Sequence, residues 1–347
     1  MYYSTLARPY NEDDEHDSPF DEDIDIISTG SEDTEIVSKS NGFRGFLRGY
    51  SVYDVMPDSG KVIIMDPDLS IAQAIGVLVY NEITCLPLWC SRSNSFYGVF
   101  TVWDLVDILV ETYDTLHSTP TPSSNWYHLV SEHSVRGWKE THPKDNITIL
   151  PTARLSEALH VLRTKHMHRL PVVDDSGSVL HIISPRRIAN FLVGKYRRTD
   201  DVSLKKTVHE LACAGVGVFD VSRIVTCEMT DLLIDVLRVL KQERIASVVI
   251  VEKLPGGIKP VNIFNTADLI GLLFGSSLPS TNLLVKDALK FQLPRREGLH
   301  VVKKDVFLKK LLQDSTQYRI HRFICVDEDG FLSGIISLGD VLKSFGE

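Results

Sequence analysis

The chain has 347 residues and a formal net charge of −9, and this length suits two domains that each bury a core of their own. The charge is uneven, because residues 1–40 carry twelve acidic against two basic side chains and the remainder is close to neutral. A near-neutral body excludes a broad basic surface for nucleic acid. No apolar run reaches the ~18 residues that a membrane helix needs. We expect a cytoplasmic protein, with the nucleus left open as a second location.

The acidic run predicts a disordered N-terminal tail over residues 1–42. It contains few apolar side chains that a core could bury, and its like charges repel one another. Two roles stay open for this tail: a solubilising segment, and a docking or regulatory segment.

Ordered structure is expected from residue 43, and the first of four similar units is predicted over residues 43–116. Its order is strand, helix, strand, strand, helix, read from short apolar runs, a polar turn and apolar residues at helical spacing. The predicted elements are a strand at residues 62–65, a helix at 71–79, strands at 85–89 and 96–100, and a helix that opens at 101.

A linker is predicted over residues 117–143, because proline and hydroxyl side chains gather at residues 118–124. The second unit follows over residues 144–198. Its predicted elements are a strand at residues 147–151, a helix with Leu155, Ala158, Leu159 and Leu162 inward, a buried strand after Arg169, and a helix led by Ser184.

The same order recurs over residues 199–277 and 278–347, so the sequence predicts four β-α-β-β-α units in an α/β (α+β) fold. The third unit is expected to have a strand at residues 224–226, a helix at 233–240, and a hairpin of strands at 247–251 and 261–264. The fourth is expected to start at residue 300, turn at 327–330 and end in a short helix at 341–345.

Two cationic pairs stand directly before buried strands, at matching places in the second and fourth units. His168 and Arg169 form the first pair, and His321 and Arg322 form the second. Arginine offers a planar fork of donors that matches phosphate oxygens. One such pair alone is usually a solvated edge pair. Its recurrence at the same place favours a ligand site that binds phosphate.

The helix that closes each unit adds a second set of polar groups. Ser184 and Ser337 stand sixteen residues after the two histidines, at predicted helix starts, where free N–H groups attract phosphate. Asp268 and Asp340 follow a capping position by three residues. Such a carboxylate either closes a capping box or accepts hydrogen bonds from ribose hydroxyls. Together with the cationic pairs, these groups predict a site for a nucleoside monophosphate.

These motifs resemble a known family. Four β-α-β-β-α units with His-Arg-Leu-Pro-Val-Val-Asp at residues 168–174 and Ser-x-x-Asp at 337–340 are similar to cystathionine β-synthase (CBS) domains. Four such units in one chain resemble the γ regulatory subunits of AMP-activated protein kinase, and so do residues 53–57 and 132–138. The resemblance runs from residue 43 to the end and implies two pairs of repeats in a flat disk.

The resemblance also implies ligands and site residues. The ligands are AMP, ADP and ATP, and no further cofactor is implied. The residues that match the family's phosphate contacts are His168, Arg169, Arg186, His321, Arg322, Thr101 and Ser337. Those that match its ribose-binding carboxylates are Asp104, Asp268 and Asp340. Further pocket candidates are Thr84, Val99, Ile147, Ile245, Ala246 and Asn265.

Four positions depart from the family pattern. Thr84 and Gln292 stand where the family has arginine, and Trp103 stands where it has threonine. Arg186 stands where the family has lysine, which keeps the charge and alters the geometry. Losing one charge-assisted contact to a phosphate weakens a site by roughly 10- to 100-fold. In the second unit Arg187 matches a family arginine that replaces the carboxylate and leaves that ribose place empty. We therefore expect the fourth unit to have the best-preserved site and the first unit the weakest.

No catalytic or metal-binding residue is predicted. The chain lacks the GxxxxGK[ST], GxSxG and HExxH motifs of nucleotide hydrolases, serine hydrolases and zinc proteases. Its five cysteines form no CxxC pair, so neither a disulfide framework nor a zinc site is indicated. We expect the cysteines to be small core residues.

The leading functional hypothesis is a nucleotide-sensing regulatory subunit. The resemblance implies a catalytic α-type kinase subunit and a β-type scaffold subunit as partners, the latter adding a strand near residues 47–53. Two alternatives stay open. One is a γ-like scaffold subunit whose nucleotide sites have decayed, and the other is a stand-alone CBS regulator of another protein.

Overall fold

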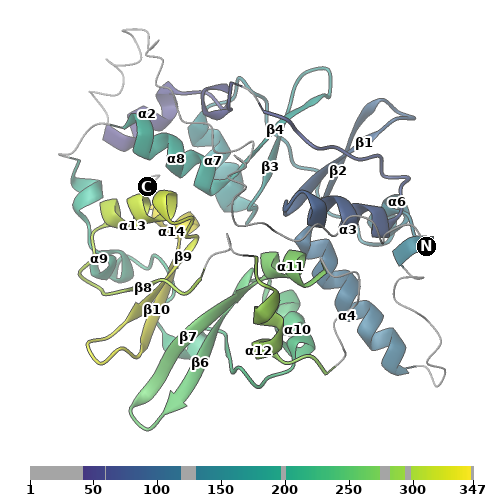
Figure 1. Cartoon of the computed structure of the whole chain (residues 1–347). Helices are drawn as coiled ribbons and strands as arrows, with labels where there is room; N and C mark the ends of the chain where they lie inside the picture. The colour runs from purple at the N-terminus through teal and green to yellow at the C-terminus, as the bar shows by residue number, and fades with distance from the viewer. Residues whose placement is uncertain are drawn as a thin grey trace, which may run out of the picture.

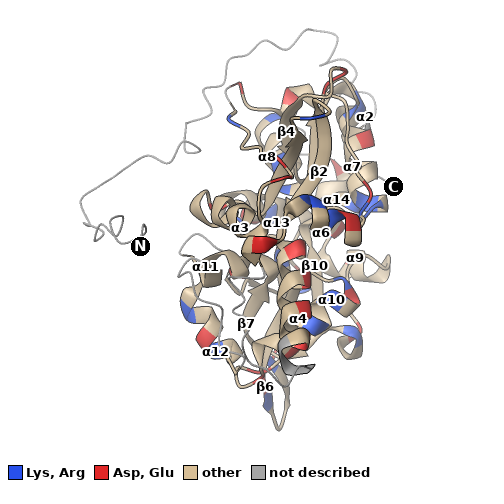
Figure 2. Ribbon diagram, turned by 90° about the vertical axis from the view of Figure 1, so that its right-hand side faces the viewer, with Lys and Arg blue, Asp and Glu red and all other residues tan. Residues whose placement is uncertain are grey.

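The computed structural model describes residues 42–58, 60–118, 130–196, 201–273, 282–293 and 298–344. These residues form four units around a common centre, in a body that is broad in Figure 1 and narrower after the 90° turn of Figure 2. The predicted α/β disk of repeats is confirmed. The predicted tail, apart from Gly42, and residues 119–129 of the predicted linker lie outside the described residues.

Each unit is built from a helix, an antiparallel hairpin and a second helical segment. The first unit has α3 (Ile71–Tyr80), β1 (Cys85–Cys90), β2 (Ser95–Thr101) and α4 (Val102–Ser118). The second has α7 (Leu155–Thr164), β3 (Leu170–Val173), β4 (Val179–Ile183) and α8 (Pro185–Lys195). The third has α10 (Leu233–Glu243), β6 (Ser247–Leu254), β7 (Gly257–Asn265), η4 (Thr266–Asp268) and α11 (Leu269–Leu273). The fourth has α13 (Leu308–Gln317), β9 (Arg322–Val326), β10 (Leu332–Ser337) and α14 (Leu338–Lys343).

The strand expected at the start of each unit is short. In the third and fourth units it is β5 (Thr226–Cys227) and β8 (Val301–Val302), each parallel to the first strand of the hairpin. In the first and second units it is reduced to a single bridge, at Met65 and at Ile149. The longer strands predicted there are wrong, because only one residue of each comes into register with the hairpin.

The first and second units exchange the segments that precede them. Helix α2 (Gly42–Gly49) precedes the first unit but packs on α7 of the second. Helix α6 (Val135–Thr141) precedes the second unit and lies in the predicted linker, but its N-cap residue Ser134 is bridged to Ser70 at the start of α3. These crossed contacts make the two units a pair.

The third and fourth units exchange their preceding segments in the same way. Helix α9 (Val208–Cys213) lies before the third unit, yet Thr207 at its start is bridged to Phe307 of the fourth. Helix α12 (Val285–Ala288) lies before the fourth unit, and Leu284 is bridged to Leu232 of the third. The chain therefore forms two pairs of units that follow one construction.

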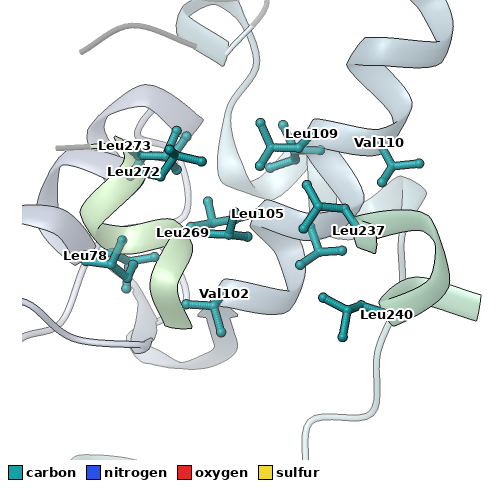
Figure 3. Close-up of a cluster of buried hydrophobic side chains, with 14 of the residues drawn as sticks. Leu78, Val102, Leu105, Leu109, Val110, Leu237, Leu240, Leu269, Leu272 and Leu273 are labelled. Carbon is teal, nitrogen blue, oxygen red and sulfur yellow. The ribbon is translucent and has the colours of Figure 1, made fainter. Parts of the chain in front are cut away.

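Two buried apolar clusters join the pairs to each other. One combines helices of the first and third units, and the other combines helices of the second and fourth. In Figure 3, Leu105 and Leu109 of α4 lie beside Leu237 of α10, with Leu269 of α11 next to them. Each unit thus shares its core with a unit of the other pair, which holds the four hairpins around the centre.

The stretch near residues 47–53, where a β-type subunit is expected to add a strand, is partly helical and partly paired within the chain. Residues 47–49 belong to α2, and the backbone N–H groups of Val52 and Tyr53 donate to carbonyl oxygens of the second unit. Strand addition needs unpaired donors and acceptors, so a partner strand would have to pair with other backbone groups of this stretch, and the added strand stays a prediction.

Two smaller expectations are also corrected. Helix α14 begins at Leu338, since Ser337 is its N-cap, and not at residue 341. Cys213 is exposed, whereas the other four cysteines are buried as expected. No helix of the described part of the chain is both long and apolar enough to span a bilayer.

Candidate functional site

One connected cavity of about 3020 Å³ lies between the four units. All sixteen residues that the sequence suggested as site residues line it, including the ones that match phosphate contacts, the three carboxylates and the apolar candidates. Its wall carries fourteen Lys and Arg residues against seven Asp and Glu residues. The cavity is therefore suited to an anionic ligand.

The same turn brings one residue to the cavity in every unit. Between the first helix and the hairpin one residue has a positive φ, namely Glu82 (51°), His166 (50°), Arg244 (52°) and Arg319 (60°). Two positions further on, the residues that line the cavity are Thr84, His168, Ala246 and His321. A non-glycine residue costs about 1 kcal/mol or more in this conformation, so its recurrence indicates that the turn is needed to place these side chains. Sequence reasoning missed this turn.

The cationic side chains of the second and fourth units lie close enough to repel one another. Burial, followed by the charges of Arg322 and Arg169, lowers the pKa of His168 to about 4. Burial and the charge of Arg169 hold the pKa of His321 well below its ordinary value. Burial and two neighbouring arginines lower the pKa of Arg186 to about 10. Buried like charges are unfavourable by themselves, and an anion among them would offset the repulsion.

The three carboxylates that match ribose ligands each close the first turn of a helix. Oδ2 of Asp340 accepts a hydrogen bond from the backbone N–H of Ser337 at 3.0 Å. Oδ2 of Asp104 and Oδ2 of Asp268 accept the equivalent bond, from the residue three positions earlier, at 2.8 and 2.7 Å. The capping-box interpretation is thus correct for one oxygen of each carboxylate. The surroundings of the other oxygen decide whether it can bind a ligand.

The second oxygens of Asp340 and Asp104 have different surroundings. Oδ1 of Asp340 is 3.3 Å from Nζ of Lys343, and the Asp340 side chain is 24% exposed. Oδ1 of Asp104 accepts from Nζ of Lys139 at 2.9 Å and from Nζ of Lys144 at 3.1 Å, and Asp104 is fully buried. The carboxylate of the fourth unit therefore has room for further donors, and that of the first unit is surrounded.

Contacts across the cavity link the third unit to the fourth. Nη1 of Arg322 donates to Oδ1 of Asn265 at 3.3 Å. Gln292, which stands where the family has arginine, donates from Nε2 to Oδ2 of Asp268 at 3.0 Å. The amide thus contacts the carboxylate instead of adding a charge to the site. Arg295 and Arg296, the arginines that lie close to Gln292 in the sequence, are outside the described residues.

The second unit contributes cations and has no carboxylate in the first turn of its second helix, α8. Ser184 caps α8, where its Oγ accepts from the N–H of Arg187 at 3.2 Å. Nε of Arg187 donates to the carbonyl oxygen of Val55 at 2.9 Å, so this side chain packs against the segment before the first unit. Nε of Arg186 is buried and has no hydrogen-bond partner among the described residues. Arg186 therefore keeps a donor for an anion.

The remaining candidates form the walls of the cavity. Val99, Ile147 and Ile245 supply apolar surface, which suits a base or another flat apolar group. Oγ1 of Thr84 accepts from Nη2 of Arg169 at 3.1 Å, so the residue in the arginine place of the family contacts a cation here. Within the described residues, no group of three His, Cys, Asp or Glu side chains is placed to hold a metal ion.

Comparison with protein families agrees with this construction. The model of the CBS domain family matches residues 52–111, 141–194 and 292–347, which lie in the first, second and fourth units. These three segments of the chain are CBS domains. The third unit lies outside the matched segments, yet it has the same order of elements and the same left-handed turn at Arg244.

Among curated proteins, this chain is similar to subunits gamma of 5'-AMP-activated protein kinase. The Dictyostelium discoideum subunit is 30% identical, over 87% of this chain and 52% of its own length. The Saccharomyces cerevisiae subunit is 28% identical, over 86% of this chain and 91% of its own length. For the Bos taurus gamma-3 subunit the values are 28%, 86% and 59%. This chain spans about half the length of the first relative and nine-tenths of the second, and it is a divergent relative of all three.

A solved structure has the same overall architecture. Protein MJ1225 from Methanocaldococcus jannaschii is 20% identical and superposes with a TM-score of 0.67, over 85% of this chain and all of that one. Similarity at this level of identity concerns the fold alone.

Proposed function

We propose that this protein is the nucleotide-sensing γ-type regulatory subunit of a kinase complex, and not an enzyme itself. Its ligands are AMP, ADP and ATP. Its partners are a catalytic α-type kinase subunit and a β-type scaffold subunit, in the cytoplasm and the nucleus. The kinship with γ subunits supports the partners, and the chemistry of the cavity supports the ligands.

One observation carries the ligand assignment. His168 and His321 come from different units, and burial together with neighbouring arginines lowers the pKa of both. Arg186 adds a buried donor with no hydrogen-bond partner in the described chain. A phosphate would accept from these donors and offset their repulsion. We propose that the phosphates of the nucleotide lie among these three residues, Arg169 and Arg322.

The fourth unit is proposed to hold the ribose. Asp340 uses one oxygen to close the first turn of α14, and its side chain, which lines the cavity, is partly exposed. A carboxylate oxygen there can accept hydrogen bonds from the two hydroxyl groups of a ribose. Asp268 is proposed for the same role in the third unit, where Gln292 takes part of its capacity.

Sensing would operate by linkage between nucleotide and kinase. AMP and ATP place different charge among the same cations, so they can stabilise different arrangements of the kinase against the disk. A ligand that binds all arrangements equally shifts no equilibrium. Each nucleotide must therefore bind the free and the kinase-bound protein with different affinities, and the ratio of these affinities must differ between AMP and ATP.

Calorimetric titration of the whole chain with AMP, ADP and ATP tests the proposal. Saturable binding that is weakened by added salt is expected, because charged groups make the contacts. A folded chain that binds none of the three would refute sensing and support the scaffold with decayed sites. Purification from cells without either kinase subunit would support the stand-alone regulator.

Binding is also expected to take up protons. The pKa of His168 is about 4 in the ligand-free protein, against an ordinary 6.5, so the ring is neutral at pH 7. A phosphate favours the protonated ring and raises this pKa, so affinity should rise as the pH falls from about 8 to about 6.5. Titrations in two buffers with different heats of ionisation measure the proton uptake. His168→Gln should lower it, and equal heats for the wild type in both buffers would contradict the prediction.

The lowered pKa of His168 also predicts how the stability of the ligand-free protein changes with pH. Because the folded-state pKa lies below the ordinary value, the unfolded chain binds the proton first. Stability should fall as the pH drops from about 6.5 towards about 4, and saturating phosphate should reduce this loss. Urea midpoints across that range measure it.

A further inference from the structure

The first unit differs from the others in what surrounds its carboxylate. Oδ1 of Asp104 accepts from three groups of the segment between the units, which are Nζ of Lys139 at 2.9 Å, Nζ of Lys144 at 3.1 Å and Nε1 of Trp138 at 3.3 Å. Oδ2 accepts from the N–H and the Oγ1 of Thr101 at 2.8 and 3.2 Å. A carboxylate has about four lone-pair sites. Asp104 is therefore saturated by the chain itself.

The donors are held in place by a wider cluster of charges. Lys144 also lies 3.1 Å from Asp107, and Lys241 of α10 lies 3.0 Å from Glu111 of α4. Figure 2 shows acidic positions along α4 beside α10. His142 is 3.1 Å from the same Glu111. The segment is thus fixed to the first unit at several points, and Lys241 ties the same helix α4 to the third unit, which makes the contacts of Asp104 part of the fold.

Burial makes these contacts hard to exchange. Asp104 is fully buried, and the side chain of Lys139 is only 12% exposed. The charges of Lys139 and Lys144 hold the pKa of Asp104 below its ordinary value, although burial alone would raise it. A ribose offers neutral hydroxyl groups, which are weaker donors than two ammonium groups. A ribose that displaced them would also leave Lys139 buried without its partner.

The fourth unit lacks this arrangement. The segment exchanged onto it, residues 207–218, makes no hydrogen bond to Asp340 among the described residues, and the only cation near Oδ1 is Lys343 at 3.3 Å. Asp340 and Asp104 close their helices in the same way. The two carboxylates therefore differ in the donors that the exchanged segment brings to Asp104 and not to Asp340.

We propose that Lys139 and Lys144 determine how many nucleotides this chain binds, by occupying Asp104 and excluding a ribose from the first unit. This inference rests on the proposed function, which makes the other places in the cavity nucleotide sites. In it, Asp104 is a structural ion-pair residue, and the third and fourth units hold the ribose-bearing ligands.

The test compares Asp104→Asn with the matched variant Asp340→Asn in the full chain. Calorimetry with AMP counts sites, and thermal unfolding measures stability. Asp104→Asn should keep the number of sites and change the Kd less than about twofold, while lowering Tm by roughly 10 °C because the buried Lys139 loses its charged partner and Lys144 loses one of two. Asp340→Asn should remove a site or weaken it at least tenfold, with Tm changed by less than about 2 °C.

A second variant separates a lost contact from a general defect. In Asp104→Asn/Lys139→Met the unpaired buried charge is removed together with the carboxylate, so the double variant should recover most of the lost Tm. Loss of an AMP site in a stable Asp104→Asn protein would overturn the proposal, and so would equal Tm values for Asp104→Asn and Asp340→Asn. If the wild type binds no AMP, the proposed function fails, and the Tm comparison still decides whether Lys139 and Lys144 hold Asp104.

Discussion

Arg322→Gln is expected to weaken the binding of AMP, ADP and ATP by about 10- to 100-fold. The charge-assisted contact that is lost is worth ~1.5–3 kcal/mol. Arg322 lies in the cationic group at the centre of the cavity, where it lowers the pKa of His168, and it donates to Asn265 of the third unit. Glutamine can keep a hydrogen bond but carries no charge. Calorimetric titration of the variant with each nucleotide measures the effect, and circular dichroism checks the fold.

The matched control is Arg92→Gln, which removes the same charge from the surface. The Arg92 side chain is 77% exposed and pairs with Asp68 at 3.0 Å, away from the cavity. Exposed pairs contribute roughly 0–1 kcal/mol, so nucleotide binding should change less than about twofold. If both variants weakened binding equally, the effect of Arg322 would be one of net charge, and its assignment as a phosphate contact would be wrong.

Gly271→Ala is expected to destabilise the protein by ~3 kcal/mol or more. Gly271 is buried in α11, and a Cβ atom there would overlap the backbone carbonyl of Phe291 in η5 (Leu289–Phe291). A backbone atom cannot rotate away as a side chain can, so α11 would have to move out of the core that the first and third units share. Urea unfolding followed by circular dichroism measures the shift in midpoint.

Gly76→Ala is the control, because Gly76 is exposed in α3 and a Cβ atom there would meet nothing within 4 Å. Alanine has the higher helix propensity, so this variant should gain ~0.5–1 kcal/mol. A Gly271→Ala protein as stable as the wild type would show that α11 is not packed as described.

The local features of the fold could be predicted because they depend on neighbouring residues. The burial of Ile71, Ala74 and Leu78 on one face of α3 follows from their spacing, and the helix starts at Ser184 and Ser337 follow from their side chains. The repeated positions of His168 and His321 also needed only comparison within the chain. The structure places both in one cavity.

The features that the sequence could not predict depend on distant partners. Met65 and Ile149 form single bridges because the hairpin sets how many residues come into register. Lys139 and Lys144 reach Asp104 only because the segment between the first two units folds back onto the first. The sequence of a capping motif is the same whether or not the second carboxylate oxygen of its aspartate already accepts hydrogen bonds from other side chains. Resemblance to a family could therefore suggest Asp104 as a ligand but could not show what covers it.

The sharing of cores between the two pairs has a consequence for synthesis on the ribosome. Helix α4 ends at Ser118 and its partner α10 begins at Leu233, so the first unit cannot bury its apolar helix face until the third has been made. At about 5–20 residues per second this interval lasts on the order of ten seconds. During that time the nascent N-terminal half exposes helices that would bind chaperones or aggregate. A chain released early, after the second unit, would keep those faces open for as long as it exists.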